Sequence, residues 1–268
     1  MFRTYREFIG YSPFAMHDNI SMLTKVTGLS QEEILANGVL NCAERRELVG
    51  MIRKLNKNYP IAYLLQSAYF YELSFYVNEN VLIPRACTGT LIDAVMEEYG
   101  PNESFKVLDI GTGSGCIAIT LAYKFPKAHV IGLDVCEKAL SVAEINQKKF
   151  QVKNVVLKRS DLMENIHCKV DVLISNPPYV GNDDEVGEEV KYEPSIALYA
   201  DDSGEKILRN IIHQSVGQVG KCIILEHAPW HGEMVSQCMK IAGYHSIKSI
   251  QDDSGKIRAT KGYAKIHE

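Results

Sequence analysis

Residues 170–179 read VDVLISNPPY, an apolar run followed directly by a polar, proline-rich end. The run Val170–Ile174 is rich in β-branched residues, which predicts a short buried strand that stops before the prolines. In open α/β sheets, ligands bind outside the carboxyl ends of the strands. The polar end of the stretch, Ser175–Tyr179, is therefore a candidate ligand-binding segment.

The Asn-Pro-Pro-Tyr segment, residues 176–179, presents hydrogen-bond acceptors on a rigid backbone. Two consecutive prolines remove two amide donors, so the carbonyl groups of Asn176 and Pro177 stay free as acceptors. Together with the side-chain oxygen of Asn176, they suit a planar –NH2 group whose nitrogen lone pair points outward at an electrophile. Because Asn-Pro also opens many turns, the segment alone leaves a plain turn open as the alternative.

Strand-like and helix-like patterns alternate on both sides of this stretch, from Lys106 onward. This alternation predicts an α/β domain whose mostly parallel sheet is covered on both faces and ends in an antiparallel pair. The predicted strands are 107–110, 130–134, 155–157, 170–174 and 222–226, with a final pair near 247–250 and 258–264; the predicted helices are 116–123, 137–150, 205–216 and 232–242.

The turn after the first of these strands is rich in glycine and reads DIGTGSGC, residues 109–116. Glycines permit a tight turn and a close backbone approach to a ligand at the start of a helix. The dinucleotide fingerprint would require glycine at position 116, which is Cys116. Asp134 ends the next strand, where a carboxylate can accept both ribose hydroxyls. Asp161-Leu162, after the third strand, offers an acceptor and an apolar wall for an adenine ring. The four strand ends together predict a cleft for an adenosine-containing ligand.

The N-terminal part of the chain carries helical patterns and no catalytic motif. A capping-box pattern at Ser30–Glu33 and an amphipathic stretch from Ala43 to Leu55 predict a module of four or five short helices. From Tyr69 the period changes to two, and a second apolar run, Val81–Ile83, follows Asn78-Glu79-Asn80, so a β-hairpin with its turn at 78–80 is expected. A helix is expected from Thr88 to Tyr99. The predicted organisation is a helical domain over 1–70, a hairpin linker over 71–86, and the α/β domain over 87–268.

The composition narrows the class of partner. The 268 residues contain 29 Lys and Arg against 33 Asp and Glu, a net charge of −4, which argues against a broad phosphate-binding surface. The seven cysteines are scattered without a C-x-x-C pair, which favours a reducing compartment and speaks against disulfides or a metal site. The chain has no signal-like start and no apolar run of about 20 residues, so a cytoplasmic protein without membrane contact is expected.

At this point the motifs resemble those of a known family. DIGTGSGCIA, from Asp109, is similar to motif I of S-adenosylmethionine-dependent methyltransferases, and NPPY is similar to motif IV of those that methylate an amide or an exocyclic amine. Further stretches resemble the protein-(glutamine-N(5)) methyltransferases of peptide chain release factors, the PrmC/HemK family. These stretches are residues 81–85, 189–198, 225–227 and several positions from 232 to 258, and the resemblance runs from about Gln66 to Gly262.

The resemblance implies a class I fold with a seven-stranded, mostly parallel, doubly wound sheet and S-adenosylmethionine as cofactor, with S-adenosylhomocysteine as product. It implies methyl transfer to N(5) of the glutamine in the Gly-Gly-Gln motif of release factors, an activity of translation termination. We further expect a monomer without stable nucleic-acid binding, and substrate recognition by the helical domain. The implied catalytic residues are Asn176, Pro177 and Tyr179; the cofactor-binding residues are Asp109, Gly111, Thr112, Gly113, Gly115, Asp134, Asp161, Leu162 and Asn176; and the substrate-binding residues are Asn176, Pro177, Pro178 and Tyr179.

Two segments depart from the family pattern. The family usually has Pro-Arg-Pro-x-Thr-Glu where this chain has Pro84-Arg85-Ala86-Cys87-Thr88-Gly89, and it has Gly-Gly-x-Asp-Gly where this chain has residues 200–204, keeping the last glycine. Two alternatives therefore stay open. One is an adenine amino-methyltransferase that acts on a flipped base of a nucleic acid. The other is a homologue that binds S-adenosylmethionine without turnover.

Overall fold

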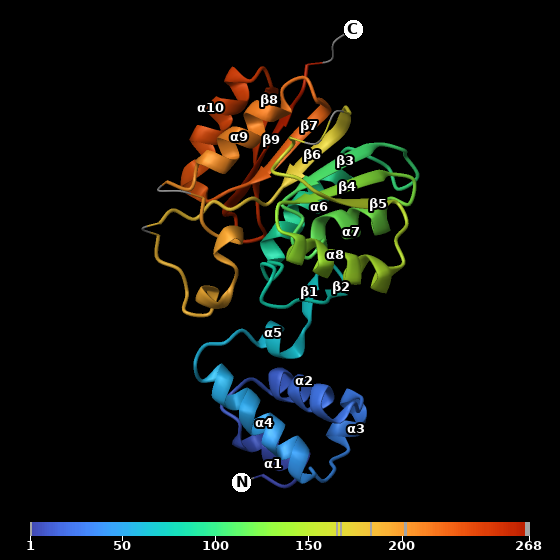
Figure 1. The fold of residues 1–268 in the computed structure, drawn as a ribbon, viewed down its shortest axis with the longest axis vertical. Coiled ribbons are helices and arrows are strands. Elements are labelled where there is room, and N and C mark those ends of the chain that lie inside the picture. Colours follow the sequence, from blue (N-terminus) through green and yellow to red (C-terminus); the bar gives the residue numbers. More distant parts are fainter. Residues whose placement is uncertain (1, 165, 167, 183, 201–202, 266–268) are drawn as a thin grey trace. The chain divides into compact units, whose positions relative to one another are not determined.

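The computed structural model describes residues 2–164, 166, 168–182, 184–200 and 203–265. The chain divides into two compact units, which are described separately: residues 1–67 with 187–192, and residues 68–186 with 193–268. Figure 1 shows the helices of the first unit and the central sheet of the second. No helix in the described part of the chain combines the length and the apolar character that a membrane span requires.

The first unit is helical, as the N-terminal sequence predicts. Its helices are α1 (Tyr5–Tyr11), α2 (Met16–Thr27), α3 (Gln31–Leu35), α4 (Cys42–Leu55) and α5 (Ile61–Leu65). The predicted capping box at Ser30 and Glu33 is present at the start of α3, and a second one, Asn41 with Glu44, begins α4. Phe8, Met22 and Leu48 are fully buried in the core of this unit. Tyr192 also belongs to it, since its hydroxyl donates to the carbonyl oxygen of Lys57 at 2.7 Å.

The second unit contains a seven-stranded sheet with the strand order β5-β4-β3-β6-β7-β9-β8. Its strands are β3 (Lys106–Ile110), β4 (His129–Asp134), β5 (Val155–Arg159), β6 (Val170–Ser175), β7 (Val219–Glu226), β8 (His245–Gln251) and β9 (Ile257–Tyr263). The first five of these pair in parallel, whereas β9 pairs antiparallel with both β7 and β8. The predicted fold class and its antiparallel end are therefore confirmed.

Helices cover both faces of this sheet (Figure 1). The helices are α6 (Gly89–Met96), α7 (Cys116–Lys124), α8 (Glu137–Phe150), α9 (Lys206–Ser215) and α10 (Gly232–Ile241). On β3, Val107 is buried in the core that contains α6 and α7, and its neighbour Leu108 is buried in the core that contains α9 and α10. Burial on both faces explains why these strands read as continuous apolar runs in the sequence.

The predicted hairpin exists, but its predicted turn is wrong. The paired strands are β1 (Ala68–Phe70) and β2 (Leu73–Phe75), joined by Tyr71 and Glu72 with φ angles of 45° and 70°. Two consecutive residues with positive φ match the twist that a two-residue hairpin turn needs. Residues 81–83 form no strand; the amide of Ile83 instead donates to the Glu193 carboxylate at 2.9 Å. Tyr-Glu lacks the usual Asn-Gly signature, and for that reason the sequence pattern pointed to 78–80.

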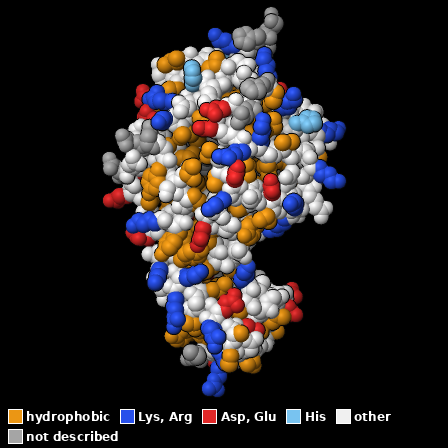
Figure 2. Space-filling view, viewed as in Figure 1, with side chains coloured by type: hydrophobic (Ala, Val, Ile, Leu, Met, Phe, Trp, Pro, Cys, Tyr) orange, Lys and Arg blue, Asp and Glu red, His pale blue; other side chains and the backbone are white. Residues whose placement is uncertain are grey.

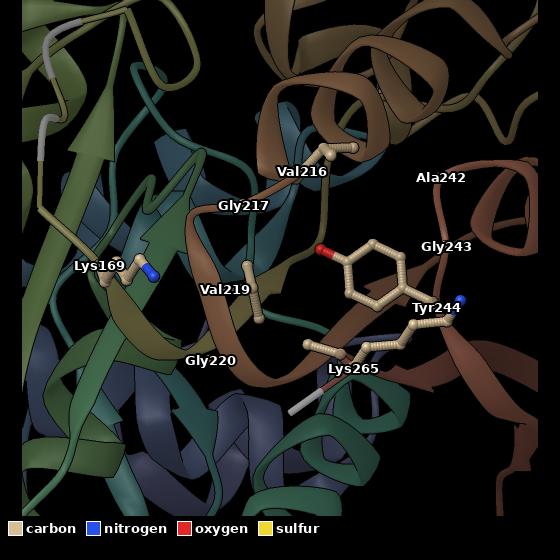
Figure 3. A pocket seen from close by; sticks show the side chains of 10 residues that line it. Lys169, Val216, Gly217, Val219, Gly220, Ala242, Gly243, Tyr244 and Lys265 are labelled. Atoms are coloured by element: carbon tan, nitrogen blue, oxygen red, sulfur yellow. The ribbon is translucent and has the colours of Figure 1, made fainter. Parts of the chain in front are cut away.

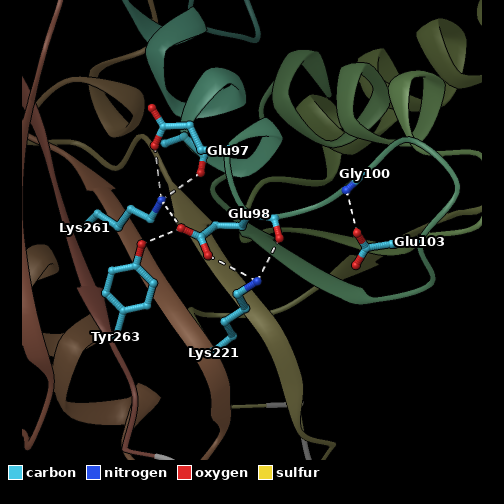
Figure 4. A network of polar contacts seen from close by, with 8 residues as sticks. Glu97, Glu98, Gly100, Glu103, Lys221, Lys261 and Tyr263 are labelled. Atoms are coloured by element: carbon cyan, nitrogen blue, oxygen red, sulfur yellow. Dashed lines mark hydrogen bonds and ion pairs between the residues drawn. The ribbon is translucent and has the colours of Figure 1, made fainter.

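A group of charged side chains anchors the C-terminal end of α6 to the sheet (Figure 4). Lys261 of β9 lies 2.6 Å from the Glu98 carboxylate, and Lys221 of β7 lies 3.2 Å from it. Tyr263 also donates a hydrogen bond to Glu98. Burial raises the pKa of Glu98, but the hydrogen bonds from these three residues outweigh burial and lower it to about 2.

Charged side chains of both signs are interspersed over the face of the second unit that Figure 2 shows. Groups of hydrophobic side chains lie between these charged side chains.

Candidate active site

The glycine-rich turn joins β3 to α7 in a conformation that requires glycine. Gly111, Gly113 and Gly115 have φ angles of 72°, 55° and 81°, a region that residues with a Cβ rarely adopt. Asp109 stabilises the turn from beneath, because its Oδ2 accepts from the Thr112 hydroxyl at 2.7 Å and from the amide of Ala118 in α7 at 3.2 Å. Complete burial raises the pKa of Asp109 to about 7.

Asp134 links this turn to the end of β4. One carboxylate oxygen accepts from the amide of Gly113 at 2.9 Å, and the other accepts from the amide of Cys136 at 2.9 Å. Burial raises its pKa, and the backbone hydrogen bonds act in the opposite direction. Each oxygen retains a lone pair for a further donor. The carboxylate is thus held in one orientation at the carboxyl edge of the sheet.

A cavity of about 310 Å³ opens at this edge, within the size range of small-molecule sites. Eight residues predicted from the sequence line it: Gly111, Gly113, Asp134, Asp161, Leu162, Asn176, Pro177 and Pro178. The described lining does not include four other predicted residues: Asp109, Thr112 and Gly115, which shape the glycine turn, and Tyr179.

The cavity is also lined by residues that we did not predict individually from the sequence. They are Asn80, Val81, Leu82, Ile110, Val135, Cys136, Ala139, Ser160, Ile196, Ala197 and Ile207. Two groups of them, 80–82 and 196–197, come from segments far from the glycine turn in the sequence. For these segments the family resemblance of 81–85 and 189–198 was the available signal, because their own composition does not suggest a ligand.

Asn176 lies directly after β6, beside the glycine turn. A Cβ built on Gly111 would lie 4.0 Å from the carbonyl oxygen of Asn176, so the two segments are in van der Waals reach. The Ser175 hydroxyl donates to the Ile110 carbonyl at 2.6 Å and ties the end of β6 to β3. The side-chain nitrogen of Asn176 donates to the hydroxyl oxygen of Thr88 at 3.1 Å. No hydrogen bond to the oxygen of this amide is formed within the described residues, so its acceptor side is left for another partner.

Tyr179 is fixed by its surroundings at the far end of the motif. Its hydroxyl donates to Oε1 of the buried Glu226 at 3.1 Å. Gly204 approaches so closely that an added Cβ would lie 2.2 Å from the Tyr179 carbonyl oxygen. His231 donates from Nε2 to the carbonyl oxygen of Ser203 at 3.0 Å and holds this approach. Asp201 and Asp202, part of the segment that departs from the family pattern, lie outside the described residues.

A second cavity, of about 380 Å³, lies at the opposite edge of the sheet, where β6 and β7 begin (Figure 3). Its lining includes Lys169, Val219, Gly220, Tyr244 and Lys265. Although it is the larger cavity, its described lining contains no carboxylate, amide or imidazole side chain. The cavity at the carboxyl edge, by contrast, is lined by the side chains of Asp134, Asp161 and Asn176.

Comparisons with known proteins identify relatives of this chain. The family model "Methyltransferase small domain" matches residues 87–192, which include the glycine turn, Asp134 and Asn176. The release factor glutamine methyltransferase of Buchnera aphidicola is 33% identical over 247 residues, covering 90% of this chain and 89% of the relative. That of Escherichia coli is 32% identical over 249 residues, covering 90% and 89%. The chain belongs to the release factor glutamine methyltransferase family.

Solved structures of more distant methyltransferases share the fold. A methyltransferase from Pyrococcus furiosus aligns with a TM-score of 0.55 at 19% identity, covering 81% of this chain and 99% of that one. A 16S rRNA N2 G1207 methyltransferase from T. thermophilus, solved with AdoMet and guanosine, aligns with a TM-score of 0.56 at 15% identity, covering 74% and 50%. At these identities the likeness shows the fold alone. With the family established, this chain is an S-adenosylmethionine-dependent methyltransferase.

The cavity fits this cofactor. Its size suits a nucleoside-containing ligand, the Asp134 carboxylate is fixed with spare acceptor capacity, and Leu162 and Val135 supply apolar lining. The glycine turn brings bare backbone to the same cavity.

Proposed function

We propose that this enzyme methylates the side-chain amide nitrogen, N(5), of the glutamine in the Gly-Gly-Gln motif of peptide chain release factors. The observation that carries the proposal is the orientation of Asn176. Its –NH2 group is engaged by Thr88, so its oxygen and the motif's free carbonyl groups are the acceptors available to a substrate amide at the edge of the cofactor cavity. The names of the two relatives reported above support a release factor as the substrate.

The acceptor array compensates for the weak nucleophilicity of an amide nitrogen, whose lone pair is delocalised into its carbonyl group. In this proposal, the side-chain oxygen of Asn176 and the carbonyl oxygen of Pro177 accept hydrogen bonds from the two N–H groups of the glutamine amide. They hold the amide in one plane and stabilise the positive charge that develops on nitrogen. Bound S-adenosylmethionine supplies an electrophilic methyl group on a sulfonium that leaves as a neutral thioether. The nitrogen then loses one proton to solvent, which leaves a neutral N-methyl amide.

The cofactor-binding roles divide between direct and indirect contact. We assign direct contact to the cavity-lining residues among those predicted, with Asp134 on the ribose and Asp161 and Leu162 around the adenine. Asp109, Thr112 and Gly115 contribute indirectly by holding the glycine turn in shape. Tyr179 contributes by packing at the end of the motif, with its hydroxyl on Glu226.

Substrate recognition is assigned to the helical domain, residues 1–70, with 71–86 as linker and 87–268 as catalytic domain. The exposed surface of the helical unit includes Tyr11 and Val39, which are 69% and 75% exposed. Exposed apolar side chains of this kind suit contact with a folded protein.

Labelled methyl transfer tests this function. The enzyme would be incubated with labelled S-adenosylmethionine and either a purified bacterial release factor or total RNA and DNA. The label should enter the release factor and should be absent when the glutamine of its Gly-Gly-Gln motif is replaced by alanine. Label in nucleic acid with none in protein would overturn the proposal in favour of an amine-methylating nucleic-acid enzyme.

A further inference from the structure

The acceptor array requires one of two possible orientations of the Asn176 amide. An asparagine side chain carries an acceptor oxygen and a donor nitrogen of nearly equal size, so a rotation by half a turn exchanges them. With the nitrogen toward the cleft, the side chain would present a donor to the substrate's –NH2 group and oppose binding. Something in the protein must therefore hold the oxygen toward the cleft.

Thr88 touches the other end of this amide but does not by itself choose the orientation. It ends the short 3₁₀ helix η1 (Ala86–Thr88), directly before α6, and is only 1% exposed. Its hydroxyl oxygen accepts from the Asn176 nitrogen at 3.1 Å. A hydroxyl group can also donate, so an isolated threonine would accept either face of the amide.

Glu226 supplies the missing direction. This residue ends β7, is 1% exposed, and in its ionised form can only accept hydrogen bonds. The Tyr179 hydroxyl donates to its Oε1, and the Thr88 hydroxyl lies close enough to the carboxylate to lower its pKa. Its Oε2 has no hydrogen-bond partner within the described residues, so the carboxylate retains capacity for the Thr88 proton.

We propose that Glu226 and Thr88 are positioning residues that fix the Asn176 amide with its oxygen toward the substrate. The carboxylate draws the Thr88 proton to itself, and the threonine oxygen is left as an acceptor that selects the nitrogen of Asn176. The inference rests on the proposed function, because the orientation matters only if the substrate presents an –NH2 group.

The charges around Glu226 permit the ionised state that this chain of hydrogen bonds needs. Arg258 from β9 and Arg85 ahead of η1 both favour ionisation, whereas burial opposes it. The carboxylate also acts electrostatically on two thiols, Cys87 in η1 and Cys116 at the start of α7, and contributes to their raised pKa. Arg85 is itself ion-paired with Glu193, and Arg258 with Asp252, so neither arginine is consumed by Glu226.

Steady-state kinetics of four variants test the inference. Thr88→Val keeps the shape and loses the hydroxyl, Thr88→Ser restores the hydroxyl, and Glu226→Gln keeps the shape but can donate. Thr120→Val is the matched control, since Thr120 is fully buried in α7 and its hydroxyl has no partner among the described residues. We expect kcat to fall by ~10- to 100-fold in Thr88→Val and Glu226→Gln, with cofactor affinity and Tm retained, and Thr88→Ser to recover most of the rate.

The double variant should lose less kcat than the two single losses together predict, because Thr88→Val and Glu226→Gln break the same chain of hydrogen bonds. Wild-type turnover in Thr88→Val, or an equal loss in Thr120→Val, would overturn the inference while the proposed function stands.

A second readout does not depend on the substrate. The side-chain amide signal of Asn176 in an NMR spectrum, assigned by its absence in Asn176→Ala, reports the hydrogen bond to Thr88. Its hydrogen exchange should be slow in the wild type and in Thr88→Ser, and faster in Thr88→Val and Glu226→Gln. Exchange that is the same in all four proteins would contradict the inference, even if the enzyme proved to methylate another amide.

Discussion

Gly204 is the residue at which a single methyl group should matter most. Gly204 is the last glycine of a segment that otherwise departs from the family pattern. Its φ is 74°, and it lies close to the Tyr179 carbonyl group. Gly204→Ala should lower stability by about 2–4 kcal/mol, since backbone strain and a steric clash add. Gly217→Ala is the matched control, because Gly217 has a φ of 75° and nothing within 4 Å of an added Cβ. Urea unfolding measures both; equal losses would show that the contact with Tyr179 does not matter.

Glu226 should give the enzyme a pH-dependent rate. Burial raises its pKa to about 7, so the carboxyl group is protonated below that pH and ionised above it. Since the ionised form orients Asn176, kcat should rise as the pH passes upward through about 7. Glu226→Gln should lack this rise, because its side chain does not titrate. A wild-type profile that is flat from pH 6 to 8 would contradict the role of ionised Glu226.

At the scale of elements, the contact between α6 and the sheet should respond to acid. The folded-state pKa of Glu98, about 2, lies below its ordinary value of 4.5. The ion pairs therefore stabilise the fold above pH 4.5, and their contribution is lost as the pH falls from 4.5 toward 2. Glu98→Gln should cost on the order of 2 kcal/mol at pH 7 and flatten the acid limb of the stability curve.

The neighbouring Glu97 provides the comparison for Glu98. The Glu97 side chain is 74% exposed, and its carboxylate lies 3.5 Å from Nζ of Lys261, which also pairs with Glu98. Glu97→Gln should change stability little, since exposed ion pairs contribute roughly 0–1 kcal/mol. Urea unfolding at several pH values separates the two variants; similar behaviour of both would mean that burial of Glu98 is not what strengthens the pairs.

The elements of the α/β part were predictable because their pattern is local. Apolar runs such as Val170–Ile174 and the amphipathic stretch Glu137–Phe150 carry their structure in consecutive residues, and α8 has the predicted bounds. The hairpin turn was missed because Tyr71 and Glu72 adopt positive φ without a residue type that announces it.

The site was predictable where residues follow strands and unpredictable where distant segments meet. Asp134, Asp161 and Asn176 stand at strand ends, so the topology of the sheet brings them to one cavity. The contact between Thr88 and Asn176 spans 88 positions, and that between Tyr179 and Glu226 spans 47. No periodicity in a single sequence encodes such contacts, and for this reason Thr88 was not identified and Glu226 was not linked to Asn176.

For the whole molecule, substrate recognition by the helical domain predicts that kcat/KM will differ between two substrates. An intact release factor should be a better substrate than a short Gly-Gly-Gln peptide, since the helical domain contributes contacts that the peptide lacks. Removal of residues 1–67 should lower kcat/KM for the intact factor and leave kcat/KM for the peptide and cofactor affinity unchanged. Equal losses for both substrates would mean that the helical unit serves packing rather than recognition.

The measurement that tests the central claim most directly is tandem mass spectrometry of a release factor after incubation with this enzyme and S-adenosylmethionine. The wild type should add one methyl group to the side-chain nitrogen of the Gly-Gly-Gln glutamine. Asn176→Ala should bind the cofactor and add none, because the acceptor array has lost its side-chain oxygen. Methylation of that glutamine by Asn176→Ala at the wild-type rate, or methylation of a different residue by the wild type, would contradict the account.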